Sequence, residues 1–117
     1  MKRIYYLGSC DKCRKILKIL EQSNIKLEKQ DIKVKALSKD QLVEMRSLVE
    51  SYEQLFSKSA RKYRTLENKD KLTEKDYEKL ILSEYTYLKR PILLDEERIF
   101  IGVNPNNMDG VVRYFST

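Results

Sequence analysis

The first third of the chain combines short apolar runs with a helical pattern. Residues 3–7, which read Arg-Ile-Tyr-Tyr-Leu and stop at Gly8, predict a buried strand. A helix is predicted over residues 11–23, and Asn24 is a suitable residue to end it. Its apolar positions recur at helical spacing and are Cys13, Ile16, Leu17 and Leu20. The more polar segment 26–32 predicts a second strand, parallel to the first because a βαβ crossover joins them.

The middle of the chain carries two signals for the start of a helix. Ser38 followed by Gln41 is a capping box, which predicts a helix from that point. Its expected apolar stripe is Leu42, Met45, Leu48 or Val49, and Tyr52. Thr73 is the expected N-cap of another helix. The inward-facing residues of that helix are predicted to be Tyr77, Leu80, Ile81 and Tyr85. Between the two helices, we expect a break or a short helix over 54–60 and a loop over 61–71, which is charged and has no clear period.

The last third predicts a hairpin and a final helix. Two apolar runs, 92–94 and 98–101, flank the acidic residues 95–97, as in a β-hairpin with a polar turn. Asn104 is the expected N-cap of the final helix, and Pro105 would occupy its first position. The apolar face of this helix consists of Met108, Val111, Val112 and Phe115.

The predicted order of elements is β-α-β, a helical insert, and then β-β-α. A mixed four-stranded sheet covered by helices would bury all of the apolar stripes, so we expect an α/β protein compatible with a thioredoxin-like fold. A chain of 117 residues suits one domain. We therefore expect a single domain over 1–117, with its core formed by 1–35 and 88–117 and a helical insertion over 36–87.

The composition excludes several classes of function. The chain has no His and two Cys, so Cys–His or Ser–His catalytic pairs and imidazole metal ligands are excluded. Two cysteines cannot form a complete Cys-only zinc site within one chain, and we expect no metal site. No apolar run approaches the roughly 20 residues of a membrane helix, and the N-terminal run is too short for a secretory signal. We expect a cytoplasmic protein that does not contact a membrane.

The positive charge is unevenly distributed. There are 24 Lys and Arg against 18 Asp and Glu, for a formal net charge of +6. Residues 1–35 hold ten of the bases and four of the acids, so the whole excess lies in the segment with both cysteines. One interpretation is a solvated face of a basic protein. The other is a positive field that favours thiolates and anionic ligands.

The two cysteines form a Cys10-Asp11-Lys12-Cys13 motif at the predicted turn from strand to helix. Free N–H groups and the positive end of a helix dipole favour an anion there, and Lys12 and Arg14 add positive charge. We expect Cys10 to be a nucleophilic thiolate and Cys13 the thiol that resolves a mixed disulfide. Two alternatives stay open: half of a metal site shared between molecules, and a chemically idle pair in which Cys13 fills the core.

A second set of residues lies late in the chain, at Arg90-Pro91. Proline blocks helix at the residue before it and cannot donate to a sheet, so it needs a special place. This segment is either an ordinary turn or a cis-proline loop beside the thiol. In the second case, Arg90 would present its guanidinium to an anion or a thiolate.

The segments Tyr6–Lys15 and Leu88–Ile92 together resemble the arsenate reductase ArsC/Spx family, and the resemblance covers nearly the whole chain. It implies a thioredoxin-like fold with a helical insertion. In the arsenate reductases of this family, a cysteine at the position of Cys10 attacks arsenate, and glutathione with glutaredoxin resolves the product. Arg90 matches their arginine before the proline, and Pro91 matches their cis-proline.

The resemblance leaves two functions open. The first is a thiol-dependent oxidoreductase that reduces a disulfide or an oxyanion, with Cys10, Cys13 and Arg90 as its catalytic residues. Its substrate-binding residues would be Lys12, Arg14, Arg90 and Pro91. It would need no cofactor beyond a thiol reductant, which is either glutathione with glutaredoxin or thioredoxin. Its partner would be a redox protein or a small thiol.

The second function is that of an Spx-type redox-sensing transcriptional regulator that binds RNA polymerase. The Cys-x-x-Cys pair resembles this branch. The positions near Ser57, Lys58 and Asn104 also lack the two further arginines of the reductases. Direct nucleic-acid binding is not expected, because several tyrosines fall on predicted core stripes and opposite charges alternate along the insert.

Overall fold

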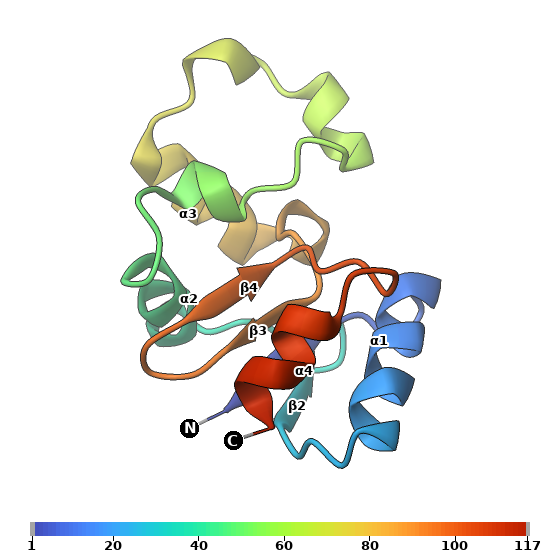
Figure 1. Cartoon of the computed structure of the whole chain (residues 1–117). Helices are drawn as coiled ribbons and strands as arrows, with labels where there is room; N and C mark the ends of the chain where they lie inside the picture. Colours follow the sequence, from blue (N-terminus) through green and yellow to red (C-terminus); the bar gives the residue numbers. More distant parts are fainter. Residues whose placement is uncertain (1, 117) are drawn as a thin grey trace. The chain divides into compact units, whose positions relative to one another are not determined.

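The computed structural model describes residues 2–116, and its chain divides into two compact units. One unit comprises residues 1–35 and 90–117, and the other comprises residues 36–89. No helix within the described residues is long and apolar enough to cross a membrane. Figure 1 shows the sheet with α1 and α4 in the first unit, and α2 and α3 in the second.

The sheet of the first unit has four strands in the order β2-β1-β3-β4. Strand β1 (Arg3–Tyr6) pairs in parallel with β2 (Glu28–Asp31), which confirms the predicted βαβ unit. Strand β3 (Ile92–Leu94) pairs antiparallel with both β1 and β4 (Ile99–Ile101), which confirms the hairpin and the mixed sheet. The α/β class and the thioredoxin-like arrangement predicted from the sequence are therefore correct.

One face of this sheet is covered by both helices of the unit. Ile4 and Leu93 are cross-strand partners on that face, and both are fully buried. They share a core with residues of α1 (Asp11–Gln22) and α4 (Asp109–Phe115). The helical members of this core are Ile16, Leu20, Val111 and Phe115. The apolar stripes from which these two helices were predicted thus pack against this face of the sheet.

The start of α4 differs from the prediction. Asn104 does not cap a helix: its side-chain oxygen accepts the N–H of Asn106 at 2.8 Å, and its carbonyl accepts the N–H of Asn107 at 2.9 Å. These bonds close a turn, and the helix begins only at Asp109, with Met108 at the N-cap. Asparagine side chains satisfy local backbone groups in turns as readily as at helix starts, so the sequence signal was ambiguous.

The second unit begins with α2 (Lys39–Arg46), and the predicted capping box of Ser38 and Gln41 is present in full. The expectation that the apolar stripe continued to Tyr52 was wrong, because the helix ends at Arg46. A second capping box at Ser51 starts a 3₁₀ turn over Tyr52–Leu55. The end of α2 is closed locally, since the Arg46 guanidinium donates to the Val49 carbonyl at 2.8 Å.

Helix α3 (Glu74–Ser83) begins at Thr73, whose capping box with Asp76 confirms the predicted start. Tyr85 lies beyond the end of this helix, in a 3₁₀ turn over Tyr85–Tyr87, so its predicted place on the helical stripe was wrong. The segment predicted as a loop over 61–71 contains two further 3₁₀ turns, Arg61–Thr65 and Lys69–Lys71.

The core of the second unit is aromatic. The ring of Phe56, which is 1% exposed, stacks on Tyr87 with centroids 5.0 Å apart and meets Tyr77 and Tyr63 edge to face. The N–H of Ser57 donates to the Tyr87 carbonyl at 2.6 Å, and Phe56 forms a bridge with Leu88. Rings at different sequence positions thus stabilise a unit that has little regular helix.

Candidate functional site: the Cys10–Cys13 helix start

The candidate site is built where β1 turns into α1. The turn from Leu7 to Cys10 is closed by the N–H of Cys10, which donates to the Leu7 carbonyl at 3.0 Å. Cys10 is the N-cap of α1 in an extended conformation, and its carbonyl accepts the first helical hydrogen bond from Arg14 at 3.0 Å. The sulfur of Cys10 is therefore placed among N–H groups that have no partner within the helix.

The pKa of Cys10 is lowered from the usual value for cysteine. Partial burial opposes ionisation, but it is outweighed by the backbone N–H and the thiol of Cys13, the backbone N–H of Lys12 and the positive charge of Arg90. These two N–H groups belong to the first turn of α1. The neighbouring N–H groups therefore act on the charged form, which is the condition for a reactive thiolate.

Cys13 has the opposite character. It is fully buried, with 0% of its surface exposed, whereas Cys10 is partly exposed. Burial and the neighbouring Cys10 sulfur raise the pKa of Cys13 to about 11. A hydrogen bond from the backbone N–H of Leu7 opposes this rise in part. Both cysteines are free in this structure. The pair thus joins an accessible, acidic thiol to an enclosed, weakly acidic one.

Arg90 and Pro91 meet this pair from the other end of the sequence. The Arg90–Pro91 bond is cis, as in the cis-proline loop that was one of the two interpretations of the sequence. Pro91 is buried directly before β3. The guanidinium charge of Arg90 acts on both sulfur atoms. The structure therefore brings the charge of Arg90 to both cysteines, and the cis bond to Pro91 directly follows Arg90 in the chain.

Lys12 and Arg14 both lie in the first turn of α1. Lys12 acts on Cys10 through its backbone N–H. The side chain of Arg14 is exposed and forms an ion pair with Asp11 one turn away, and it also approaches the Gly8 carbonyl at 3.4 Å. Both partners of the Arg14 guanidinium thus lie close to it in the sequence. Its role in binding a substrate stays a prediction.

Sequence analysis missed one residue that shapes this loop. The carboxylate of Asp31, at the end of β2, accepts the N–H of Gly8 at 3.1 Å. Asp31 is the last acidic residue of the predicted strand 26–32, which is the one signal that could have singled it out. Its partner could not be foreseen, because Gly8 lies 23 residues earlier in the sequence.

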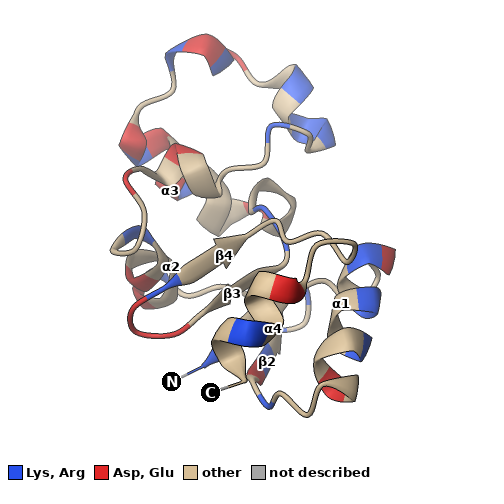
Figure 2. Cartoon of the chain, in the orientation of Figure 1, with Lys and Arg blue, Asp and Glu red and all other residues tan. Residues whose placement is uncertain are grey.

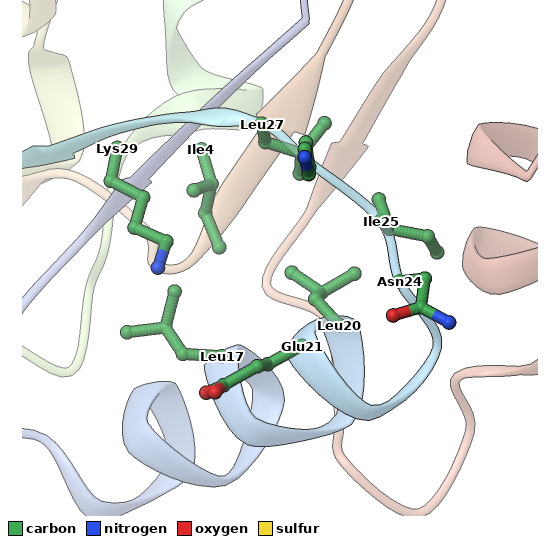
Figure 3. Close-up of a pocket in the computed structure, with 9 residues that line it drawn as sticks. Ile4, Leu17, Leu20, Glu21, Asn24, Ile25, Leu27 and Lys29 are labelled. Carbon is green, nitrogen blue, oxygen red and sulfur yellow. The ribbon is translucent and has the colours of Figure 1, made fainter.

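A cavity of the first unit lies apart from this site. A cavity of about 420 Å³ lies between α1 and the segment that leads into β2, and its nine lining residues include neither cysteine nor Arg90. Figure 3 shows Leu17 and Leu20 of α1 pointing toward Ile4 and Lys29 across it. Among residues 2–116, no group of three or more Cys, Asp and Glu side chains is placed to hold a metal ion.

The fold and this site define a thioredoxin-like protein with a Cys-x-x-Cys motif at the start of its first helix and a cis-proline directly before β3. The ArsC family model matches residues 5–111. The chain therefore belongs to the ArsC family. This confirms the resemblance indicated by the segment with the two cysteines and by the segment with Arg90-Pro91.

Two sequence relatives are named as transcriptional regulators. The chain is 32% identical over 110 residues to "Global transcriptional regulator Spx 1" of Oceanobacillus iheyensis, covering 92% of this chain and 84% of that protein. It is 31% identical over 103 residues to "Global transcriptional regulator Spx 2" of Bacillus anthracis, covering 86% and 79%.

Solved structures with the same fold include proteins named as reductases. An arsenate reductase from Vibrio cholerae superposes with a TM-score of 0.79 at 17% identity, covering 97% of this chain and 96% of that one. An arsenate reductase (ArsC) related protein from Brucella melitensis gives a TM-score of 0.76 at 23% identity, covering 93% and 92%. At these identities, the likeness establishes the fold.

Proposed function

We propose that this chain is a cytoplasmic thiol–disulfide redox protein in which Cys10 is the attacking thiolate and Cys13 the resolving thiol. The observation that carries the proposal is the asymmetry of the pair. Cys10 is accessible and its pKa is lowered, whereas Cys13 is fully enclosed and its pKa is raised to about 11. Such a pair directs the first attack to one sulfur.

The proposed reaction balances in two exchanges. The Cys10 thiolate attacks one sulfur of a substrate disulfide, a mixed disulfide forms, and the other substrate sulfur leaves as a thiolate that takes up a proton from solvent. Cys13 then loses its proton and attacks the Cys10 sulfur, which releases the second substrate thiol and closes the Cys10–Cys13 disulfide. Two electrons pass from the protein to the substrate.

The first exchange also activates the second. Two of the causes that raise the pKa of Cys13 come from the Cys10 sulfur, as a hydrogen-bond partner and as a negative charge. Both are removed once Cys10 is bonded to a substrate sulfur. The pKa of Cys13 therefore falls in the mixed disulfide, although its burial remains. Glutathione with glutaredoxin, or thioredoxin, would then return the pair to its reduced state.

Arg90, Pro91, Lys12 and Arg14 are the proposed substrate-binding residues. Arg90 is the best supported of them because its charge already acts on the cysteine sulfurs. A guanidinium at this point would also attract an oxyanion or the carboxylates of a peptide-like disulfide.

Trapping the mixed disulfide tests this function. With a small aromatic disulfide as substrate, Cys13→Ser should accumulate a mixed disulfide at Cys10, detected as an adduct mass on the Cys10 peptide. Cys10→Ser is the matched control, and it should form no adduct and lose turnover by at least about 100-fold, since the remaining thiol is buried and poorly ionised. Turnover by Cys10→Ser at the parent rate would refute the proposal.

A second candidate is a redox-sensing regulator, in which closing the same disulfide alters binding to RNA polymerase. It is favoured by the relatives named as global transcriptional regulators. Near two positions where the reductases carry arginine, this chain has other residues, Lys58 and Asn104. Lys58 forms an ion pair with Glu53 at 2.6 Å, and Asn104 closes a turn. Co-purification of polymerase with the oxidised and reduced chain decides between the two, and capture in neither state would exclude the regulator.

A further inference from the structure

The loop that carries Cys10 is held from outside its own helix. We infer that Asp31 is a positioning residue for Cys10, holding the Leu7–Cys10 turn where the first N–H groups of α1 can stabilise the thiolate. This inference rests on the proposed function, because it concerns the same attacking sulfur.

The carboxylate of Asp31 joins two backbone segments. Its Oδ2 atom accepts the N–H of Gly8 at 3.1 Å, and its Oδ1 atom accepts the N–H of Lys33 at 3.0 Å. Asp31 ends β2 opposite Tyr6, which ends the neighbouring strand β1. The side chain therefore connects the turn after one strand to the turn after the other, just where the backbone ladder stops.

This connection lies two residues before the nucleophile. Gly8 is held by Asp31, and Cys10 donates its N–H to the Leu7 carbonyl within the same turn. From the other side, the N–H of Arg14 holds the Cys10 carbonyl at the start of α1. The turn that ends at Cys10 is thus held by α1 on one side and, through Gly8, by the Asp31 carboxylate of a distant segment on the other.

The absence of a side chain at Gly8 fits this arrangement. A Cβ atom built on Gly8 would lie 2.7 Å from Oδ2 of Asp31, closer than real Cβ contacts allow. Any side chain at position 8 must therefore displace the carboxylate or move the turn. Asp31 and Gly8 should act as one unit.

Charge and positioning predict opposite effects when Asp31 is removed. A negative charge near a thiol raises the pKa of that thiol, so loss of the charge alone would lower the pKa of Cys10. Loss of the held turn would instead let the sulfur move away from the N–H groups that stabilise its thiolate, and the pKa would rise. The sign of the change therefore separates the two roles.

The test measures alkylation of Cys10 by iodoacetamide against pH in the full reduced chain, with the Cys10 peptide quantified by mass spectrometry. Asp31→Ala should shift the midpoint upward and slow alkylation at pH 7 by on the order of threefold to tenfold, in proportion to the thiolate fraction. Asp31→Asn, which keeps one acceptor oxygen, should fall between Asp31→Ala and the parent.

Asp95→Ala is the matched control. Asp95 accepts the N–H groups of Glu97 and Arg98 at 2.8 and 2.9 Å in the β3–β4 turn, so it loses the same kind of bond away from the cysteines. Its midpoint should equal that of the parent. An unchanged or lowered midpoint in Asp31→Ala, or an equal rise in Asp95→Ala, would overturn the inference.

Gly8→Ala supplies a second route that keeps the carboxylate in the chain. Alone it should also raise the midpoint, and added to Asp31→Ala it should cause little further change, because the two substitutions break the same contact. Additive effects would contradict the inference. Failure of the parent chain to close the Cys10–Cys13 disulfide on oxidation would instead count against the proposed function, while these midpoints still decide the role of Asp31.

Discussion

At the scale of single residues, the charge of Arg90 acts on two sulfur atoms that differ in exposure. It lowers the pKa of the partly exposed Cys10 together with local hydrogen bonds, and for Cys13 it opposes the larger effect of burial. The same positive charge therefore favours the thiolate at both sulfurs, but at Cys13 the effect of burial is larger and the thiol stays protonated. Burial decides which of the two ionises.

Replacing Arg90 tests this contribution. Arg90→Gln should slow alkylation of Cys10 at pH 7 by about twofold to fivefold, since a positive charge favours the thiolate and only one of several stabilising groups is lost. Arg90→Lys retains the charge and should recover most of the rate. A rate that is equal in the parent and in Arg90→Gln would show that the guanidinium does not act on Cys10.

The residues that the sequence identified are those whose chemistry is carried by the residue type. Cys10, Cys13 and Arg90-Pro91 are recognisable by type and local spacing, and in the structure the charge of Arg90 acts on both sulfur atoms. Asp31 is an ordinary acid in the sequence, and its contact with Gly8 exists only because β1 and β2 pair in parallel. The role of a residue whose contact depends on strand pairing cannot be derived from the sequence around it alone.

At the scale of elements, a helix start is predictable where the sequence holds a full capping box, whereas the single N-cap signal at Asn104 misplaced the start of α4. The predicted starts at Ser38 and Thr73 are both correct because a capping box satisfies its N–H groups within four residues. The apolar stripe of α2 was predicted to continue to Tyr52, but the helix ends at Arg46, whose guanidinium donates to the Val49 carbonyl. The hairpin was predictable, since its acidic turn is closed by Asp95 within the turn itself.

Removing the cap at Ser38 measures what this local signal contributes. Ser38→Ala should lower the free energy of unfolding by about 1 kcal/mol, because the N–H of Gln41 loses its acceptor. Ser38→Asn, which keeps an acceptor suited to this position, should stay close to the parent. Urea unfolding followed by circular dichroism gives both values, and equal stabilities of Ser38→Ala and the parent would contradict the assignment.

At the scale of the whole molecule, the excess positive charge and the cysteine pair lie in one unit. Lys and Arg outnumber Asp and Glu by six within residues 1–35, and they are visible along α1 in Figure 2, while acids gather at the β3–β4 turn. Cys13, Lys12 and Arg90, which tune Cys10, all belong to this same unit. Net charge and its distribution were readable from the sequence because they need no knowledge of packing.

The most direct test of the account is the pH dependence of alkylation at each cysteine separately, measured on the reduced chain by mass spectrometry. Cys10 should react with a midpoint below that of an ordinary thiol, and Cys13 should stay protected until the pH approaches its pKa of about 11. Oxidation should then close the pair with the loss of two hydrogens. Equal midpoints for the two thiols, or a lower midpoint for Cys13, would contradict the account.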